Sequence, residues 1–350
     1  MQGYLVLENG KVFKGERFGA GGDVTAEVVF TTGMTGYLET LTDMSFRGQI
    51  VVQTFPLIGN YGVIPPDFES DTIGPAGYIV REWCQIPSNF RSEGNLDTFF
   101  ASCGLVALAG IDTRALTKII RDTGVIRGCI TDDPANVDFE ALKAYRMSGE
   151  VAQVSTKESY TVPADKERFK VALLDCGTKR SIIQELTTRG CSVTVYPHDT
   201  AAAEILAAQP DGIVLSGGPG DPAENAELIA TVKTLSESGV PLFGIALGHQ
   251  LLALARGYKI GALPYGHRGA NQPVRHMETG RVYITGQNHR YVVETASLDT
   301  KAEVLFEHVN DGSCQGLRYL DIPAFSVQFN GGPLDTLFVY DDFITMMEGR

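Results

Sequence analysis

The chain has 350 residues and a formal net charge of −13, with 43% hydrophobic and 20% charged residues. This length favours two domains over one, and the composition is that of an ordinary globular protein. A strongly negative chain is a poor partner for the phosphate backbone of nucleic acids. No stretch approaches the roughly 20 apolar residues of a membrane span, and the first residues contain no basic leader pattern. We therefore expect a cytoplasmic protein without nucleic-acid or membrane partners.

Residues 1–152 form the first predicted domain, a mixed β/α domain of short strands and turns. Asn9-Gly10 is a strong hairpin signal, and Gly21-Gly22 marks another turn. A helix is predicted over 112–124, because Asp112 or Thr113 can cap its beginning and Gly124 can end it. A second helix is predicted over 138–145. The predicted strands are residues 4–7, 12–13, 27–31, 49–54 and 77–80.

Residues 153–168 are polar and form the predicted linker, and residues 169–350 form the second predicted domain. Its first part alternates continuous apolar strands with amphipathic helices, which is typical of a parallel sheet covered on both faces. Ligands of such sheets bind beyond the carboxyl ends of the strands. The predicted strands are 170–174, 192–196, 212–215 and 242–245, and the predicted helices are 179–189, 201–207, 227–238 and 248–255. After residue 269 the sequence favours β-hairpins, with strands at 274, 282–285, 291–294, 302–307, 315–319 and 324–328.

Residues 240–255 carry the most informative pattern. A short apolar run passes through a glycine-flanked corner into a run of helical period. A strand that enters a helix through such a corner usually presents a nucleophile above the end of the sheet. Gly244 and Gly248 lie two residues to either side of the corner residue, Ala246, which has no nucleophilic atom. The sequence therefore predicts a nucleophile turn without its nucleophile.

The six cysteines are scattered, without a Cys-x-x-Cys pair or the Cys/His spacing of a metal site, so we expect free thiols and no bound metal. Cys176 is the only one whose position at a strand end suggests a substitute nucleophile. A reactive thiol also needs an activating group, so we expect Cys176 to be structural. No Gly-x-x-x-x-Gly-Lys-Ser/Thr loop is present, which argues against ATP as a substrate of this chain.

The heptapeptide at 244–250, Gly-Ile-Ala-Leu-Gly-His-Gln, resembles the nucleophile turn of class I glutamine amidotransferases, in which cysteine replaces the alanine. Nearly the whole chain resembles one family among them, the small subunit of carbamoyl-phosphate synthetase. The matching segments are residues 35–43, 56–63, 110–117, 216–222 and 266–271. The first three are specific to this subunit, because other class I amidotransferases lack the amino-terminal domain. The resemblance implies a flavodoxin-like, mostly parallel amidotransferase domain after that domain.

Three departures from the family pattern concern the reaction itself. Ala246 takes the place of the nucleophilic cysteine. The family continues its last strand with Gln-X-His-Pro-Glu, whereas residues 327–332 here read Val-Gln-Phe-Asn-Gly-Gly, and about four residues with the base and the acid are missing. The gap can be placed in two ways, so Asn330 either does or does not take the position of the histidine. Arg290 replaces a glycine, which predicts either a backbone with unfavourable φ or a long cation at the pocket mouth.

The glutamine pocket, in contrast, is largely retained by resemblance. Amide hydrolysis also needs an oxyanion hole, and the resemblance assigns part of it to the backbone N–H of Leu247. His249 and His289 are ordinary members of the family pattern, and we expect structural or pocket roles for them. The residues that the resemblance places around glutamine are Ser45, Gly218, Gly220, Leu247, Gln250, Asn288, Arg290 and Tyr291.

Two functions follow from these features. The first is a small subunit with an inactive glutaminase, paired with a large subunit that carries ATP and Mg²⁺ and makes carbamoyl phosphate for pyrimidines and arginine. The second is a non-catalytic module that binds glutamine or another metabolite, or acts as a scaffold. A lone cysteine-to-alanine change would be typical of a deliberate substrate trap, but the base and the acid are missing as well. In triad hydrolases the loss of the nucleophile alone costs about 10⁶ in turnover.

Overall fold

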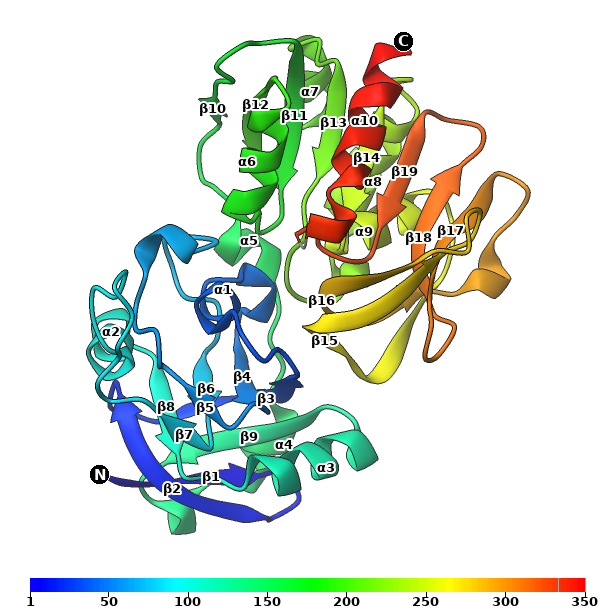
Figure 1. Ribbon diagram of the computed structural model, residues 1–350. Helices are drawn as coiled ribbons and strands as arrows, with labels where there is room; N and C mark the ends of the chain where they lie inside the picture. The colour runs from blue at the N-terminus through cyan, green and yellow to red at the C-terminus, as the bar shows by residue number, and fades with distance from the viewer. Residues whose placement is uncertain (333, 350) are drawn as a thin grey trace. The chain divides into compact units, whose positions relative to one another are not determined.

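The computed structural model describes residues 1–332 and 334–349, and the chain divides into two compact units, Met1–Ser148 and Gly149–Arg350 (Figure 1). The predicted linker at 153–168 lies inside the second unit, where Tyr160–Val162 pairs with the strand Cys191–Pro197. In the described residues, no helix has both the length and the apolar character needed to cross a membrane.

The first unit is built on a closed barrel with the strand order β1-β2-β8-β6-β4-β3-β9. All five predicted strands and both predicted helices are present, with somewhat different bounds. The strands are β1 (Gln2–Leu7), β2 (Val12–Gly19), β3 (Val24–Thr31), β4 (Gln49–Gln53), β5 (Leu57–Ile58), β6 (Gly77–Ile79), β7 (Glu82–Trp83), β8 (Val106–Ala109) and β9 (Ile126–Thr131). The helices are α1 (Tyr37–Leu41), α2 (Leu96–Cys103), α3 (Thr113–Thr123) and α4 (Phe139–Ala144), with short 3₁₀ turns at η1 (Met44–Phe46), η2 (Pro65–Asp67) and η3 (Pro134–Asn136).

The second unit is built on a ten-stranded sheet with the order β10-β12-β11-β13-β14-β19-β18-β17-β15-β16. The pairs that join β12, β11, β13 and β14 are parallel, as predicted; β14 and β19 are also parallel, and the remaining pairs are antiparallel. Its strands are β10 (Tyr160–Val162), β11 (Phe169–Asp175), β12 (Cys191–Pro197), β13 (Gly212–Leu215), β14 (Leu242–Ile245), β15 (Ile260–His276), β16 (Val282–Val293), β17 (Ala302–His308), β18 (Cys314–Tyr319) and β19 (Ala324–Val327). Its helices are α5 (Glu150–Val154), α6 (Arg180–Thr188), α7 (Ala202–Ala207), α8 (Ala226–Ser236), α9 (Leu247–Ala255) and α10 (Phe338–Glu348), with 3₁₀ turns at η4 (Pro222–Glu224), η5 (Thr295–Ser297) and η6 (Leu334–Thr336).

Two apolar clusters cover the two faces of the parallel strands. Successive strand residues alternate between them: Ile213 and Leu215 join the cluster with α7, α8 and α9, whereas Val214 joins the cluster with α6 and α10. Figure 1 shows α6 and α10 on the near face of this sheet. The alternation follows from the two-residue period of a strand, and burial on both faces explains why these strands are apolar throughout.

Two predictions for the end of the chain need correction. The hairpin region starts earlier than residue 269, because β15 is one strand from Ile260 to His276 that pairs with β16 along most of its length. The final strand, β19, is not only a hairpin partner of β18, since it also pairs in parallel with β14. This second pairing brings the end of β19 beside the end of β14, where the corner residue lies.

Candidate functional site

The corner after β14 has the strained backbone of a nucleophile turn. Ala246 joins β14 to α9 with φ 50° and ψ −107°. Among the described residues it shares a positive φ with only one other non-glycine residue, Gln209. Such a conformation costs about 1–3 kcal/mol and persists only when the surroundings hold it. Here the Ala246 N–H donates to Val327 O at 2.8 Å, and the Ala246 carbonyl accepts from Gln250 N at 3.2 Å.

The two glycines that flank the corner allow backbone segments to approach closely. A Cβ atom on Gly248 would lie 2.3 Å from Leu215 O, and one on Gly244 would lie 2.9 Å from Gly248 O. The Gly248 N–H donates to Ser216 O at 3.0 Å, which ties the first turn of α9 to the end of β13. Only glycine fits at these positions, so the turn is built as the sequence predicts.

The glycine-rich loop after β13 is equally restricted. A Cβ atom on Gly218 would lie 2.0 Å from Cys176 O, and Gly220 has a φ of +90°. Such close backbone approach and positive φ both require glycine. A Cβ atom on Gly220 would also lie 3.0 Å from a carboxylate oxygen of Glu150, a residue of α5 that the sequence did not single out.

Asn330 lies beside the corner. A methyl group on Gly217 would lie 3.4 Å from Ala246 Cβ and 4.0 Å from Asn330 Oδ1, so both side chains border the same point. The Asn330 N–H donates to Gly286 O at 2.9 Å, which fixes the chain just after β19. A carboxamide forms hydrogen bonds but does not accept a proton at neutral pH. Of the following residues, Pro333 lies outside the described part of the chain.

The two neighbouring histidines are both buried. His249 Nδ1 shares a hydrogen bond of 2.7 Å with Ser326 Oγ, and burial lowers its pKa to about 3. His289 contacts Tyr291 O at 3.0 Å and Gln287 Oε1 at 2.9 Å through its two ring nitrogens. Burial and the nearby His267 hold the pKa of His289 well below its usual range. Both rings are therefore neutral at pH 7, and their recorded contacts are with structural groups.

Cys176 is fully buried, and burial raises the pKa of its thiol. The next contributions are a nearby carboxylate, Asp175, which raises the pKa further, and the Ser216 hydroxyl, which lowers it. A thiol whose pKa is raised has little thiolate at neutral pH. The structure thus gives no chemical basis for Cys176 as a substitute nucleophile.

Two of the predicted glutamine-contacting residues, Gln250 and Tyr291, contact each other in the second unit. Gln250 Nε2 donates to Tyr291 O at 2.8 Å and to Gln328 Oε1 at 3.0 Å, which links α9 to β16 and to the end of β19. The Nδ2 atom of Asn288 and the Nε2 atom of Gln328 are buried donors with no hydrogen-bond partner. Unpaired buried donors are costly, so these two atoms are suited to a polar ligand. Gln328 belongs to the stretch at 327–332 that follows the last strand, and the resemblance does not assign it to the pocket.

Of the two alternatives for Arg290, the strained backbone is wrong. Arg290 lies within β16 and is absent from the described non-glycine residues with positive φ. Its guanidinium carbon lies 5.9 Å from the centre of the Tyr291 ring. Ser45 belongs to the first unit, in η1, where its N–H donates to Asp43 Oδ1 at 2.9 Å.

A strained strand-to-helix corner, a glycine cradle beside it and a parallel sheet beneath define the second unit as a class I glutamine amidotransferase domain. The family "Glutamine amidotransferase class-I" matches residues 172–330, and "Carbamoyl-phosphate synthase small chain, CPSase domain" matches residues 5–130. The chain belongs to the carbamoyl phosphate synthase small chain family.

Relatives with this name match almost the whole chain. The "Carbamoyl phosphate synthase small chain" of Bacillus anthracis is 47% identical over 99% of this chain and 96% of its own length. The protein of the same name from Streptococcus agalactiae serotype III is 43% identical over 99% of this chain and 98% of its own length. A solved glutamine amidotransferase from Thermotoga maritima is 17% identical, with a TM-score of 0.39 over 51% of this chain and 85% of that chain.

Proposed function

We propose that this chain is a small subunit of carbamoyl-phosphate synthetase whose glutaminase is inactive. The observation that carries the proposal is the pair at the corner: a methyl group at Ala246 and a carboxamide at Asn330. Glutamine hydrolysis needs a nucleophile and a base that activates it, and neither side chain provides one. The remaining candidates, Cys176, His249 and His289, are buried groups whose pKa values are shifted toward the unreactive or neutral form.

In this proposal the partner is a large cytoplasmic subunit that holds ATP and Mg²⁺ and uses free ammonia. The chain then contributes by binding and stabilising that subunit, in the pathway to pyrimidines and arginine. The test is co-purification with a large subunit, followed by assays of carbamoyl phosphate formation with glutamine and with ammonia. We expect activity with ammonia only. Equal activity with both nitrogen donors would overturn the proposal. Failure of the two chains to co-purify would rule out the large subunit as the partner.

A second candidate function is glutamine or metabolite binding without chemistry. The unpartnered donors of Asn288 and Gln328 favour it, because a ligand with carboxylate or amide oxygens would satisfy them. The test is calorimetry with glutamine on the parent chain, on Asn288→Ala and on Arg290→Gly. If the chain is a sensor, glutamine gives saturable heat, and Asn288→Ala weakens the affinity for glutamine. Arg290→Gly strengthens this affinity if the arginine occupies the pocket mouth. The absence of heat at millimolar glutamine would eliminate this candidate.

A further inference from the structure

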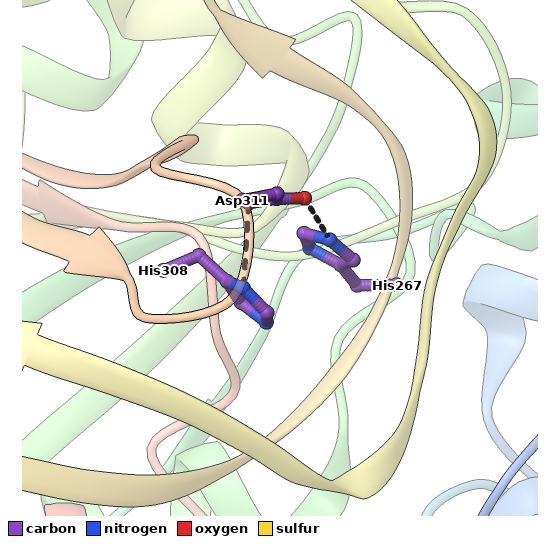
Figure 2. Close-up of side chains that lie close together, drawn as sticks. All are labelled: His267, His308 and Asp311. Carbon is purple, nitrogen blue, oxygen red and sulfur yellow. Dashed lines mark hydrogen bonds and ion pairs between the residues drawn. The ribbon is translucent and has the colours of Figure 1, made fainter.

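Three side chains of the second unit, distant from the corner in sequence, form a compact cluster of metal-ligand type. They are His267 on β15, His308 at the end of β17, and Asp311 in the turn that leads to β18 (Figure 2). One ligand atom from each residue lies within 4.8 Å of the other two. The spacing of the cysteines and histidines predicted no metal site, because these residues meet only when β15 pairs with β17.

The distances within the cluster are close to those of a bound ion. His267 Nε2 donates to Asp311 Oδ2 at 2.8 Å, and His308 Nδ1 lies 3.3 Å from Asp311 Oδ1. Ligands of a tetrahedral ion with bonds of about 2.0–2.1 Å lie roughly 3.3 Å apart. The two imidazole rings are stacked at a centroid distance of 4.1 Å and an interplanar angle of 15°, so one ring must rotate out of the stack before both can direct a nitrogen lone pair at the same ion.

The tautomer of His308 leaves a lone pair facing a carboxylate. Its Nε2–H donates to Gln272 Oε1 at 3.1 Å, so Nδ1 is the unprotonated nitrogen. This nitrogen accepts only a long contact of 3.3 Å from Asn310 N–H, while Asp311 Oδ1 lies at the same distance. Two electron-rich atoms that face each other repel, and a cation between them would turn this repulsion into coordination. A ligating histidine whose other nitrogen donates to a carbonyl is typical of metal sites.

Further features of these residues and of the whole chain support an ion. His267 is buried, at 8% exposure, and its Nδ1 atom has no hydrogen-bond partner, so the ring can carry its proton on Nδ1 and leave Nε2, the nitrogen that faces Asp311, free to bind an ion. The Asp311 carboxylate accepts from Ser313 N at 3.0 Å and from Ser313 Oγ at 2.8 Å, which orients it toward the rings. Its side chain is 40% exposed, which leaves a path from solvent, and the net charge of −13 favours cations.

We propose that His267, His308 and Asp311 bind one divalent transition-metal ion of the Zn²⁺ class, with water as the fourth ligand. Two imidazoles and one carboxylate suit Zn²⁺, Co²⁺ or Ni²⁺ and not Mg²⁺ or Ca²⁺, which prefer oxygen ligands. The ion joins β15 to the β17–β18 turn. It lies beside the strand pair that carries a pocket residue, because Arg268, which follows His267, is paired with Asn288.

The experiment is zinc titration of the metal-free full-length chain by calorimetry, with metal content measured after gel filtration. The variants are His308→Ala and Asp311→Asn, and the control is His198→Ala, which removes one histidine outside the cluster. Asp311→Asn keeps the shape of a half-exposed side chain, so it tests the site even if His308→Ala misfolds.

We expect one zinc per parent chain, unchanged affinity in His198→Ala, and affinity weakened at least about 100-fold in both cluster variants, since loss of a direct ligand exceeds the 10–100-fold effect of outer-shell changes. Zinc should also raise the unfolding temperature of the parent and of His198→Ala only. Cobalt should give the visible absorption of a four-coordinate ion. Two results would overturn the proposal. One is zinc binding that remains unchanged in both cluster variants, as it would if the free cysteines bound the metal. The other is the absence of saturable zinc binding by the parent chain.

Discussion

The corner after β14 and the chain that follows β19 border the same point, yet they differ in what holds them in place and in the side chains that they present. At the corner the backbone is intact, with the strained φ of 50° at Ala246 and two glycines that no other residue can replace. After β19, residues 328–332 contain no histidine or acidic side chain, and Asn330 stands beside the corner. The comparison indicates that the backbone of the turn is required for packing as well as for chemistry, because it connects β13, β14 and β19 to α9. The fold of this turn therefore does not depend on a reactive side chain at the corner.

The largest effect is expected from a change that breaks the corner itself. Gly248→Ala places a methyl group 2.3 Å from Leu215 O, so the turn must open or the helix must shift. Overpacking of this kind costs about 3 kcal/mol or more, since rigid backbone is the obstacle. Urea unfolding of the full chain measures this loss of unfolding free energy. Gly286→Ala is the control, because a methyl group there meets nothing within 4 Å, and its stability should equal that of the parent.

The next prediction restores side chains to both regions. Ala246→Cys alone should release little ammonia from glutamine, because no base lies beside it. The double variant Ala246→Cys/Asn330→His should exceed it by at least about 10-fold, since a positioned general base contributes about 10²–10⁴. Ammonia release under saturating glutamine is the measurement. If the single variant were as active as the double variant, Asn330 would not occupy the place of the base.

Release of the stored strain should give a smaller effect. Ala246→Gly relieves the positive φ but makes the unfolded chain more flexible, so we expect a net gain of about 1 kcal/mol in unfolding free energy. Gln209→Gly, at the other described non-glycine residue with positive φ, is the comparison outside the corner. We expect a smaller gain there, because only Ala246 is fixed by the meeting of three strand ends. A loss of stability in Ala246→Gly would contradict the strain that we assign to the turn.

The last prediction concerns an effect that is spread over several pH units. Burial lowers the pKa of His249 from 6.5 to about 3, so below pH 6.5 the unfolded chain binds a proton that the folded chain does not. The stability associated with the neutral ring is complete above about pH 6.5 and is lost as the pH falls toward 3, with a slope of at most about 1.4 kcal/mol per pH unit. His249→Asn should reduce the slope of unfolding free energy between pH 6 and pH 4. An unchanged slope in His249→Asn would refute this assignment.

Local patterns explain what the sequence predicted well. The corner at 240–255 was predicted because the apolar run, the glycines and the helical period all lie within one short segment. The parallel strands were predicted for the same reason, since burial on both faces makes them apolar throughout. Helix α10 was not predicted, although its buried residues, among them Val339 and Phe343, recur at helical spacing.

Long-range pairing explains what the sequence did not predict. Closure of the barrel depends on the pairing of β1 with β9, whose residues are more than a hundred positions apart. The position of Asn330 depends on the parallel pairing of β19 with β14, which a gap in a motif does not fix. The cluster of His267, His308 and Asp311 likewise depends on β15 meeting β17. Residue spacing alone carries no signal for contacts of this kind.

The most direct test of the central claim is ammonia release by the unaltered chain, alone and in complex with a large carbamoyl-phosphate synthetase subunit, at saturating glutamine. The double variant Ala246→Cys/Asn330→His serves as the matched reference in the same assay. We predict no release above background from the unaltered chain in either setting, together with carbamoyl phosphate formation from added ammonia in the complex. Ammonia release from the unaltered chain at the rate of a working amidotransferase, or a thioester trapped with labelled glutamine, would contradict the account.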